Sequence, residues 1–325
     1  MTTLLEVRDL TIEFPAREGP AVRPVDGVGF TLERGKTLAL VGESGCGKSL
    51  TSLAILGLVP PPGRLAAGSA VTLEGAELTS MPPRELRAIR GRRVAMVFQD
   101  PMTSLNPVLT VGRQIGEVAE LHLRLGRRQA RSRAADLLRE VGIADPDGRL
   151  DQYPHQLSGG MRQRVMIAIA LAGEPDVLIA DEPTTALDVT VQAQILELLD
   201  AIQRSRGMAL LLITHDLGIV AGHADRVAVM YAGRIVEEAP TESLFAAPSH
   251  PYTIGLLASV PRIAGPPGRL QPIPGTVPSP AHWPSGCRFH PRCPEVMERC
   301  RHDAPPPLPV GPEHGMRCWL AEAEG

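Results

Sequence analysis

Apolar residues recur along most of the chain with two spacings, one typical of strands and one typical of helices. Alternating apolar positions over residues 5–10 and 28–32 predict β-strands near the start of the chain. Apolar runs at residues 37–41, 93–98 and 208–214 predict further strands, the last of them buried. In the segments between these strands, apolar residues recur with a helical spacing.

Helical spacing fills the intervals between the strands. Apolar residues at near three-and-four spacing predict helices within residues 110–142, 163–171 and 190–204, and a helix-like stretch covers residues 50–58 until a proline run. Because strands and helices alternate, we expect an α/β core with a largely parallel sheet.

The last quarter of the chain has a different character. A predicted hairpin over residues 227–237, turning at Ala232-Gly233, is its last clear β signal. After about residue 245 proline becomes dense, as in Pro305-Pro306-Pro307, and the periodicity fades. Such a segment cannot bury much apolar surface by itself, so something else must hold it if it is ordered.

The composition excludes several classes of protein. Hydrophobic residues make up 43% of the chain and the net charge is −3, which is ordinary for a globular protein and gives no reason to expect a nucleic-acid partner. No apolar run approaches the length of a bilayer span, and Met1 to Leu10 lacks the basic-then-apolar order of a signal peptide. We therefore expect a cytoplasmic chain whose membrane role, if any, is peripheral.

The most informative segment follows the predicted strand at residues 37–41 and opens the next helix. It has the spacing of a P-loop, in which glycines let the backbone wrap around phosphates. Lys48 supplies a positive charge for the β- and γ-phosphates, and Ser49 offers an oxygen to Mg²⁺. A plain glycine turn is the alternative, but it would not require Lys-Ser in this context. The candidate ATP-binding residues are Gly42, Glu43, Ser44, Gly45, Cys46, Gly47, Lys48, Ser49 and Leu50.

A second strand, residues 177–182, ends in two acids. Asp181 is placed to hold Mg²⁺, through water, and Glu182 to polarise the water that attacks the γ-phosphate. A pair of acids after a strand can also be a helix N-cap. Together with the P-loop, however, the pair predicts a nucleotide hydrolase.

A serine–glycine segment opens the predicted helix near residue 163. Ser158 and the N–H groups of the glycines form a second candidate anion site at a helix start. Since the chain already has a P-loop for the same phosphate, this site is best used by another copy or a related subunit. The segment comprises Leu157, Ser158, Gly159, Gly160 and Met161.

The order of P-loop, Gln99 after a strand, Leu-Ser-Gly-Gly, acid strand and His215 after a strand resembles the ATP-binding-cassette (ABC) ATPases over residues 4–240. The resemblance implies a P-loop NTPase fold with a RecA-like core, an antiparallel β subdomain and a helical subdomain at about residues 100–160. It also implies two cassettes that face head to tail, with each ATP between one P-loop and the other's serine–glycine segment.

The same resemblance implies roles for single residues. Phe14 looks like the residue that stacks on adenine, although a core or edge aromatic is the alternative. Gln99 looks like a residue that touches Mg²⁺ or the attacking water and also contacts a transmembrane partner. Asp188 looks like part of a loop at the dimer interface. His215 looks like a switch that reads the γ-phosphate, and its alternative is a capped structural histidine. Lys48 and Glu182 complete the catalytic set.

The tail resembles the extension of ATPase subunits in oligopeptide, dipeptide and nickel importers, through residues 249–253 and 287–294. It implies a nucleotide-binding domain over residues 1–245 and an importer-type extension over residues 246–325. We expect a peptide importer at the cytoplasmic face of the membrane, with a related second ATPase, two permease subunits and an extracytoplasmic binding protein. Alternatives are a nickel importer, or a non-transport cassette protein acting on ribosomes or DNA.

Four of the five cysteines crowd the last forty residues: Cys287, Cys293, Cys300 and Cys318. No Cys-x₂-Cys pair occurs, so the common zinc spacings are missing. Four thiolates could bind zinc or an iron–sulfur cluster, His290, His302 and His314 leave mixed ligation open, and free thiols are the plain alternative. The resembled importer subunits can carry a [4Fe-4S] cluster on such a tail, so we expect a cluster, with Zn²⁺ second.

Overall fold

The structure is a computed structural model of the 325-residue chain, and it describes residues 2–16, 18–185, 187–259 and 272–322. The chain forms two compact units, which are described separately. The first contains Met1–Thr2, Glu33–Lys36 and Ser80–Leu212, and the second contains Thr3–Leu32, Thr37–Thr79 and Ile213–Gly325. The boundary predicted at residue 245 stays a prediction, and residues 260–271 and 323–325 of the predicted extension lie outside the described residues.

The second unit contains an antiparallel sheet, as expected. Its strands are hydrogen-bonded in the order β2-β1-β5-β6, and β4 also pairs with β1. Leu5, Val7 and Leu10 of β1 are buried between more exposed neighbours, which agrees with the predicted alternation. The strands are β1 (Thr3–Phe14), β2 (Val22–Glu33), β4 (Arg64–Leu65), β5 (Ala70–Leu73) and β6 (Ala76–Glu77).

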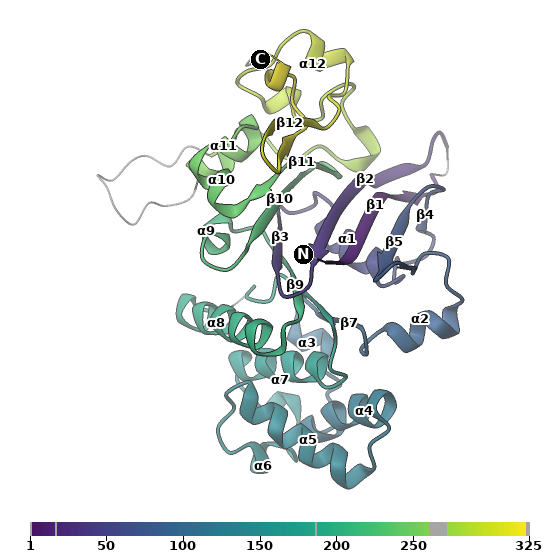
Figure 1. Ribbon diagram of the computed structural model, residues 1–325, viewed down its shortest axis with the longest axis vertical. Helices are drawn as coiled ribbons and strands as arrows, with labels where there is room; N and C mark the ends of the chain where they lie inside the picture. Colours follow the sequence, from purple (N-terminus) through teal and green to yellow (C-terminus); the bar gives the residue numbers. More distant parts are fainter. Residues whose placement is uncertain (1, 17, 186, 260–271, 323–325) are drawn as a thin grey trace. The chain divides into compact units, whose positions relative to one another are not determined.

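A second set of strands in this unit runs in the order β12-β13-β11-β10-β3. β3 and β10 are parallel, whereas β10 and β11 form the predicted hairpin around Ala232 and Gly233. The strands are β3 (Thr37–Val41), β10 (Arg226–Tyr231), β11 (Arg234–Pro240), β12 (Leu308–Gly311) and β13 (His314–Met316). The proline-rich tail therefore contributes β12 and β13 to the edge of this sheet, and the other strands come from earlier in the chain (Figure 1).

Helices and turns of the second unit are short. They are α1 (Lys48–Ile55), α9 (Leu217–Val220), α10 (Thr241–Ala246), α11 (Pro251–Ala258), α12 (Arg299–His302), η2 (Pro280–His282), η3 (His290–Arg292) and η4 (Trp319–Glu322). The helix expected to continue to residue 58 ends at Ile55. Gly57 adopts a φ of +60°, so the left-handed glycine ends the helix before the proline run does.

The tail is held by the core of the second unit. Tyr252 of α11 and Phe289 are buried against Tyr231 of β10, with ring centroids 4.6 Å and 5.1 Å from that of Tyr231. Aromatic side chains bury a large area each, so this cluster supplies the apolar contact that the tail cannot supply alone.

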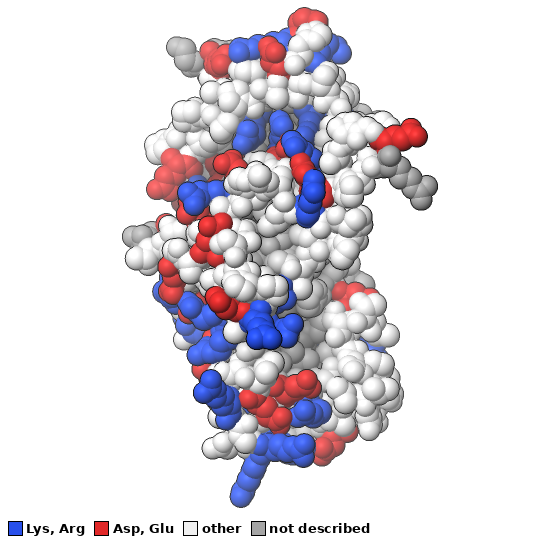
Figure 2. Space-filling model, turned by 90° about the vertical axis from the view of Figure 1, so that its right-hand side faces the viewer, with Lys and Arg blue, Asp and Glu red and all other residues white. Residues whose placement is uncertain are grey.

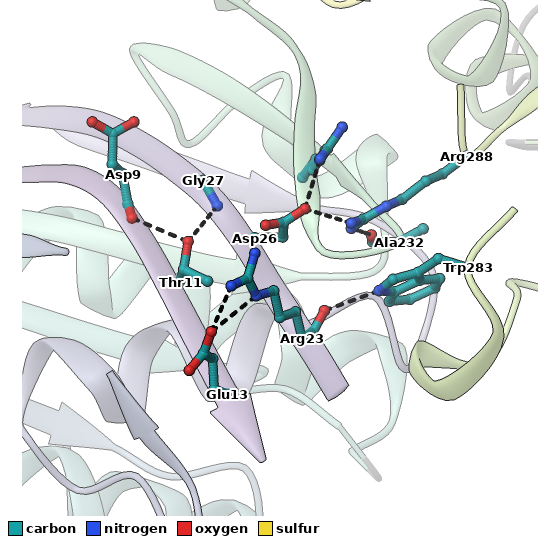
Figure 3. A network of polar contacts seen from close by, with 10 residues as sticks. Asp9, Thr11, Glu13, Arg23, Asp26, Gly27, Ala232, Trp283 and Arg288 are labelled. Atoms are coloured by element: carbon teal, nitrogen blue, oxygen red, sulfur yellow. Dashed lines mark hydrogen bonds and ion pairs between the residues drawn. The ribbon is translucent and has the colours of Figure 1, made fainter. Parts of the chain in front are cut away.

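Polar contacts join the tail to the start of the chain. Arg288 of the tail donates to the carboxylate of Asp26 and to the carbonyl oxygen of Ala232, and Trp283 Nε1 donates to the carbonyl oxygen of Arg23 at 2.9 Å (Figure 3). Asp26 also accepts from Arg234. Burial is the largest single influence on the Asp26 carboxyl and raises its pKa, but Arg234 and Arg288 together outweigh it and hold the pKa below its usual value.

The first unit contains the strands β7 (Val94–Val97), β8 (Val177–Asp181) and β9 (Ala209–Thr214), in the order β9-β8-β7. β7 and β8 are parallel, with Val97 opposite Ala180, and all five residues of β8 are buried. Its helices and turns are α2 (Pro83–Ile89), α3 (Pro101–Ser104), α4 (Val111–Leu123), α5 (Arg127–Glu140), α6 (Pro146–Arg149), η1 (Pro154–Gln156), α7 (Gly159–Leu171) and α8 (Val189–Arg206).

The helical region predicted at residues 110–142 consists of two helices. Arg124 adopts a φ of +56°, which ends α4, and Gly126 caps α5. The two helices pack closely, since a Cβ on Gly116 of α4 would lie 3.7 Å from the Cβ of Ala130 of α5 (Figure 1). Within the described ranges, no helix is long and apolar enough to cross a membrane.

Charged side chains of the first unit are paired. Arg131 and Arg133 of α5 contact Asp151 and Glu174 at 2.8 Å and 3.0 Å. On the face drawn in Figure 2, Lys and Arg side chains lie interspersed with Asp and Glu. Exposed pairs of this kind are screened by solvent and contribute little to stability, so they do not determine the fold.

Glu237 of β11 is the buried carboxylate on which the tail depends. It is fully buried and accepts hydrogen bonds from the backbone N–H groups of Ser249 (2.8 Å) and His250 (3.0 Å), and its Oε1 lies 2.8 Å from Nε2 of His314. Burial lowers the pKa of His250 to about 4, so this ring is neutral, and its Nδ1 accepts from the N–H of Tyr252.

We expect Glu237→Gln to lower the free energy of unfolding by about 3 kcal/mol. The amide replaces one carboxylate oxygen by an NH₂ group, which cannot accept a hydrogen bond from a backbone N–H. Urea unfolding followed by circular dichroism measures the loss. Glu238→Gln on the same strand is the control, since that carboxylate is partly exposed and pairs with Arg226; its loss should stay under about 1 kcal/mol. Equal unfolding midpoints for the two variants would contradict the assignment.

Candidate functional site

The predicted P-loop lies in the second unit, between β3 and α1. Gly42 has a φ of +155° and Gly47 a φ of +110°, and neither could carry a side chain. A Cβ on Gly42 would lie 2.1 Å from the carbonyl oxygen of Met230, and one on Gly47 would lie 2.8 Å from that of Pro24. The loop is therefore pressed against two neighbouring backbones, which only glycine permits.

Lys48 begins α1 and curls back over the loop. Its side chain is almost fully buried, and Nζ donates to the carbonyl oxygens of Gly42 at 2.7 Å and Glu43 at 3.1 Å. The Sγ of Cys46 lies 3.9 Å from Nζ, and burial raises the pKa of this thiol. Cys46 thus fills space as a neutral side chain, while the ammonium group and the first N–H groups of α1 provide donors for an anion.

Two other predicted residues belong to the second unit. Phe14, at the end of β1, packs over Gly63, since a Cβ there would lie 2.7 Å from the ring. His215 follows β9 and is exposed, and the start of α9 is capped by Asp216, which accepts from the N–H of Gly218 at 2.8 Å. The role expected of His215 stays a prediction.

In the first unit, Gln99 and Glu182 come together. Both follow strands of the parallel pair β7–β8, each two residues after a member of the register pair Val97 and Ala180. Gln99 Nε2 donates to Glu182 Oε2 at 3.0 Å, and Thr185 Oγ1 donates to the same oxygen at 3.0 Å. The glutamate carboxylate is thus held from two sides.

The backbone at Glu182 is unusual. Its φ of +45° lies in the left-handed region, which costs a residue with a side chain about 1–3 kcal/mol. Asp181, the residue before it, is buried at the end of β8. Neither acid caps the following helix, because Asp188 fills that position at α8. The N-cap alternative for this acidic pair is therefore wrong, and the positive φ is a feature that sequence reasoning missed.

The serine–glycine segment starts α7 as predicted. Ser158 is the N-cap, and its Oγ accepts from the N–H of Met161 at 3.3 Å. Gly160 faces Val191 closely, since a Cβ would lie 2.9 Å from its Cγ1, and Leu157 is buried. Asp188 caps α8 by accepting from the N–H of Val191 at 2.9 Å. Ala186, its neighbour in the predicted interface loop, lies outside the described residues.

The four tail cysteines are free thiols that influence one another. Burial raises the pKa of Cys293 and of Cys318 to about 11 and raises that of Cys287, and the charges of neighbouring cysteines add to each shift. The N–H of Cys287 donates to the carbonyl oxygen of Cys300 at 2.8 Å. The backbone at Cys287 therefore lies against that at Cys300.

The structure does not support the metal site expected in the tail, neither the iron–sulfur cluster nor zinc. Among the described residues, no group of three or more His, Cys, Asp or Glu side chains is arranged to hold a metal ion. The three histidines considered for mixed ligation have other partners: His290 contacts the carbonyl oxygen of Cys287, His302 contacts Glu298, and His314 contacts Glu237. The described residues therefore support neither the iron–sulfur cluster nor zinc or mixed ligation.

The chain is similar to known proteins along its whole length. Residues 25–185 match the family described as "ABC transporter", and residues 236–300 match "Oligopeptide/dipeptide transporter, C-terminal region". The oligopeptide transport ATP-binding protein AppD of Bacillus subtilis (strain 168) is 51% identical over 325 residues, covering 100% of this chain and 99% of AppD. The chain belongs to the ABC transporter ATPases.

Other members of this family support the assignment. The dipeptide transport ATP-binding protein DppD of Escherichia coli (strain K12) is 51% identical over 302 residues, covering 93% of this chain and 92% of DppD. A solved dimeric structure of MJ0796, described as a bacterial ABC transporter cassette, matches with a TM-score of 0.65 and 27% identity, covering 73% of this chain and 99% of that one. The predicted ABC cassette fold is confirmed.

We expect the buried tail thiols to react slowly in the reduced, metal-free chain. A pKa near 11 leaves Cys293 and Cys318 mostly protonated at pH 8, so their alkylation by iodoacetamide should be about 100-fold slower than in urea. The rate should rise as the pH approaches 11, because the raised pKa delays thiolate formation. Mass spectrometry of the alkylated peptides gives the rates, and equal rates with and without urea at pH 8 would show that these thiols are not shielded.

Proposed function

We propose that this chain is the ATP-hydrolysing subunit of an importer that takes up di- and oligopeptides. The observation that carries the proposal is similarity along the full chain, including the C-terminal region, to ATP-binding proteins named for oligopeptide and dipeptide transport. These names favour peptides over nickel and over a non-transport role on ribosomes or DNA. Two permease subunits, an extracytoplasmic binding protein and a position at the cytoplasmic face of the membrane follow from this function.

ATP and Mg²⁺ fit the residues of the P-loop. Lys48 and the start of α1 supply positive charge and N–H donors for the phosphates. Ser49, Gln99 and Asp181 supply oxygen atoms of the kind that Mg²⁺ prefers. The bound ion neutralises charge on the phosphates during hydrolysis. Phe14 is assigned to the adenine and His215 to the γ-phosphate.

Glu182 is assigned as the group that activates water. Its carboxylate is held by Gln99 and Thr185, so its orientation is fixed before a nucleotide binds. Such a base accepts a proton as water attacks the γ-phosphate, and positioning supplies most of the remaining catalysis. The strained backbone at Glu182 supports this role, since strain of this kind concentrates at functional sites.

The start of α7 is assigned to the nucleotide of a second cassette. Ser158 and the N–H groups after it form an anion site at the start of a 13-residue helix, flanked by Leu157 and Met161. The solved dimer of MJ0796 supports a pairing of two cassettes. The second cassette is a related subunit rather than a copy, and Asp188 lies at the interface.

We also propose a [4Fe-4S] cluster on Cys287, Cys293, Cys300 and Cys318. The presence of four unbonded thiols in the tail supports it. In such a cluster each cysteine binds a different iron, so the sulfurs need not converge on one point as they do around zinc. A bound cluster would stabilise the thiolate forms that burial disfavours.

The test of the cluster is anaerobic purification followed by visible absorption and analysis of iron, sulfide and zinc. We expect a broad band in the visible range and about four iron atoms per chain, both lost on treatment with a chelator and oxidant. A colourless chain that contains no iron and still has a folded tail would end this proposal without touching the ATPase.

The test of the transport function uses the chain reconstituted with its permease subunits in vesicles. Addition of the binding protein with a peptide should stimulate ATP hydrolysis and peptide uptake, whereas nickel should not. Stimulation by nickel alone would favour the nickel importer, and failure of every ligand would overturn the importer function.

Glu182→Gln supplies the matched catalytic test in the same vesicles. We expect ATP binding to persist and hydrolysis to fall by about 10²–10⁴-fold, the usual contribution of a general base. Because the nucleotide is then trapped, ATP should also convert the isolated chain and its partner cassette into a dimer on size-exclusion chromatography. Near-normal turnover would remove Glu182 from this role.

A further inference from the structure

The P-loop residue Glu43 is bound by the tail. Its two carboxylate oxygens accept from Arg292, with NH1 at 2.6 Å from Oε2 and NH2 at 3.0 Å from Oε1. The Arg292 side chain is only 5% exposed and that of Glu43 is 31% exposed, so the guanidinium is buried while the carboxylate keeps partial access to water. The two residues are 249 positions apart in the sequence.

Arg292 is fixed from the tail side as well. Its Nε donates to the carbonyl oxygen of Pro274 at 2.8 Å, and NH2 lies 3.4 Å from the carbonyl oxygens of Ile273 and Gly275. The guanidinium also lies 5.7 Å from the ring centroid of Tyr231. A side chain held at so many points cannot follow Glu43 if the loop moves, so it acts as a fixed anchor.

A second tail residue holds the backbone of Glu43. The hydroxyl of Tyr252 accepts from the N–H of Glu43 at 2.9 Å, and Tyr252 is fully buried in the aromatic cluster with Phe289. Lys48 completes the set by donating to the carbonyl oxygen of Glu43. The side chain, N–H and carbonyl of one loop residue are therefore all engaged, two of them by the tail.

We propose that Arg292 is a positioning residue for ATP binding, which acts through Glu43 to hold the P-loop in the conformation that receives phosphate. A P-loop binds through the orientation of its backbone N–H groups, and a loop that is already ordered loses less conformational entropy on binding. The tail thus serves the nucleotide site directly, besides any cluster that its cysteines hold. The proposal rests on the nucleotide site of the proposed function.

The test compares Arg292→Met with Arg288→Met in the full chain, with ATP binding measured by titration calorimetry. Both substitutions remove a largely buried guanidinium from the same tail segment, but Arg288 is bound to Asp26 and Ala232 rather than to Glu43. We expect Arg292→Met to raise the Kd for ATP by about 10-fold, within the range typical of coupled sites, and Arg288→Met to leave it within about twofold. Both should lower the melting temperature.

Glu43→Gln in the same assay separates positioning from general loss of structure. If Arg292 acts through Glu43, then Arg292→Met should change the Kd by less than about twofold once Glu43 is already Gln. Arg292→Lys, which keeps the charge without the fork, should recover part of the affinity.

Three results would overturn the proposal: an unchanged Kd in Arg292→Met, an equal increase in Arg288→Met, or fully additive effects of Glu43→Gln and Arg292→Met. Wild-type protein is titrated first, so failure of ATP to bind there would count against the proposed function and not against the role of Arg292 alone.

Discussion

The nucleotide loop depends on direct packing of backbone against backbone. Gly42 is pressed against the carbonyl of Met230 in β10, and Gly47 against that of Pro24 in β2. These two strands belong to different sheets of the second unit, so both sheets must be formed before the loop has its shape. The glycines of the motif serve the phosphate and also this packing, because a side chain at either position would force the strands apart.

The nucleotide loop also depends on contacts with the tail, which is distant in sequence. Aromatic residues are only 3% of the chain, yet two of its three tyrosines and Phe289 form the cluster that joins the tail to β10. The prediction that the tail could not form a core of its own agrees with this arrangement. The prediction did not name what the tail packs against. The tail shares the core of the second unit and adds β12 and β13 to its sheet. The importance of Tyr252 is then twofold, since its ring packs in the cluster and its hydroxyl holds Glu43.

Local signals in the sequence were sufficient for most of the fold and for the P-loop, because glycine spacing and apolar periodicity act over a few residues. The meeting of Gln99 and Glu182 was also within reach, since the ends of adjacent parallel strands lie together. Two features could not be predicted from the sequence. The left-handed backbone of Glu182 has no signal in residue type, and the pair Arg292–Glu43 joins residues whose separation exceeds any periodicity. The cysteines near Arg292 suggest metal binding, and no local pattern marks the arginine itself.

Helix capping and anion binding are compatible at Ser158. The Oγ of Ser158 satisfies one N–H group, that of Met161, whereas a helix start presents four N–H groups without intrahelical partners. A cap of this kind fixes the direction of the helix and leaves donors for a phosphate. The acidic pair Asp181 and Glu182 differs, because Asp188 caps the next helix and the pair has no such structural duty there. A carboxylate that caps no helix, sits on a strained backbone and is oriented by Gln99 and Thr185 is best explained by its chemistry.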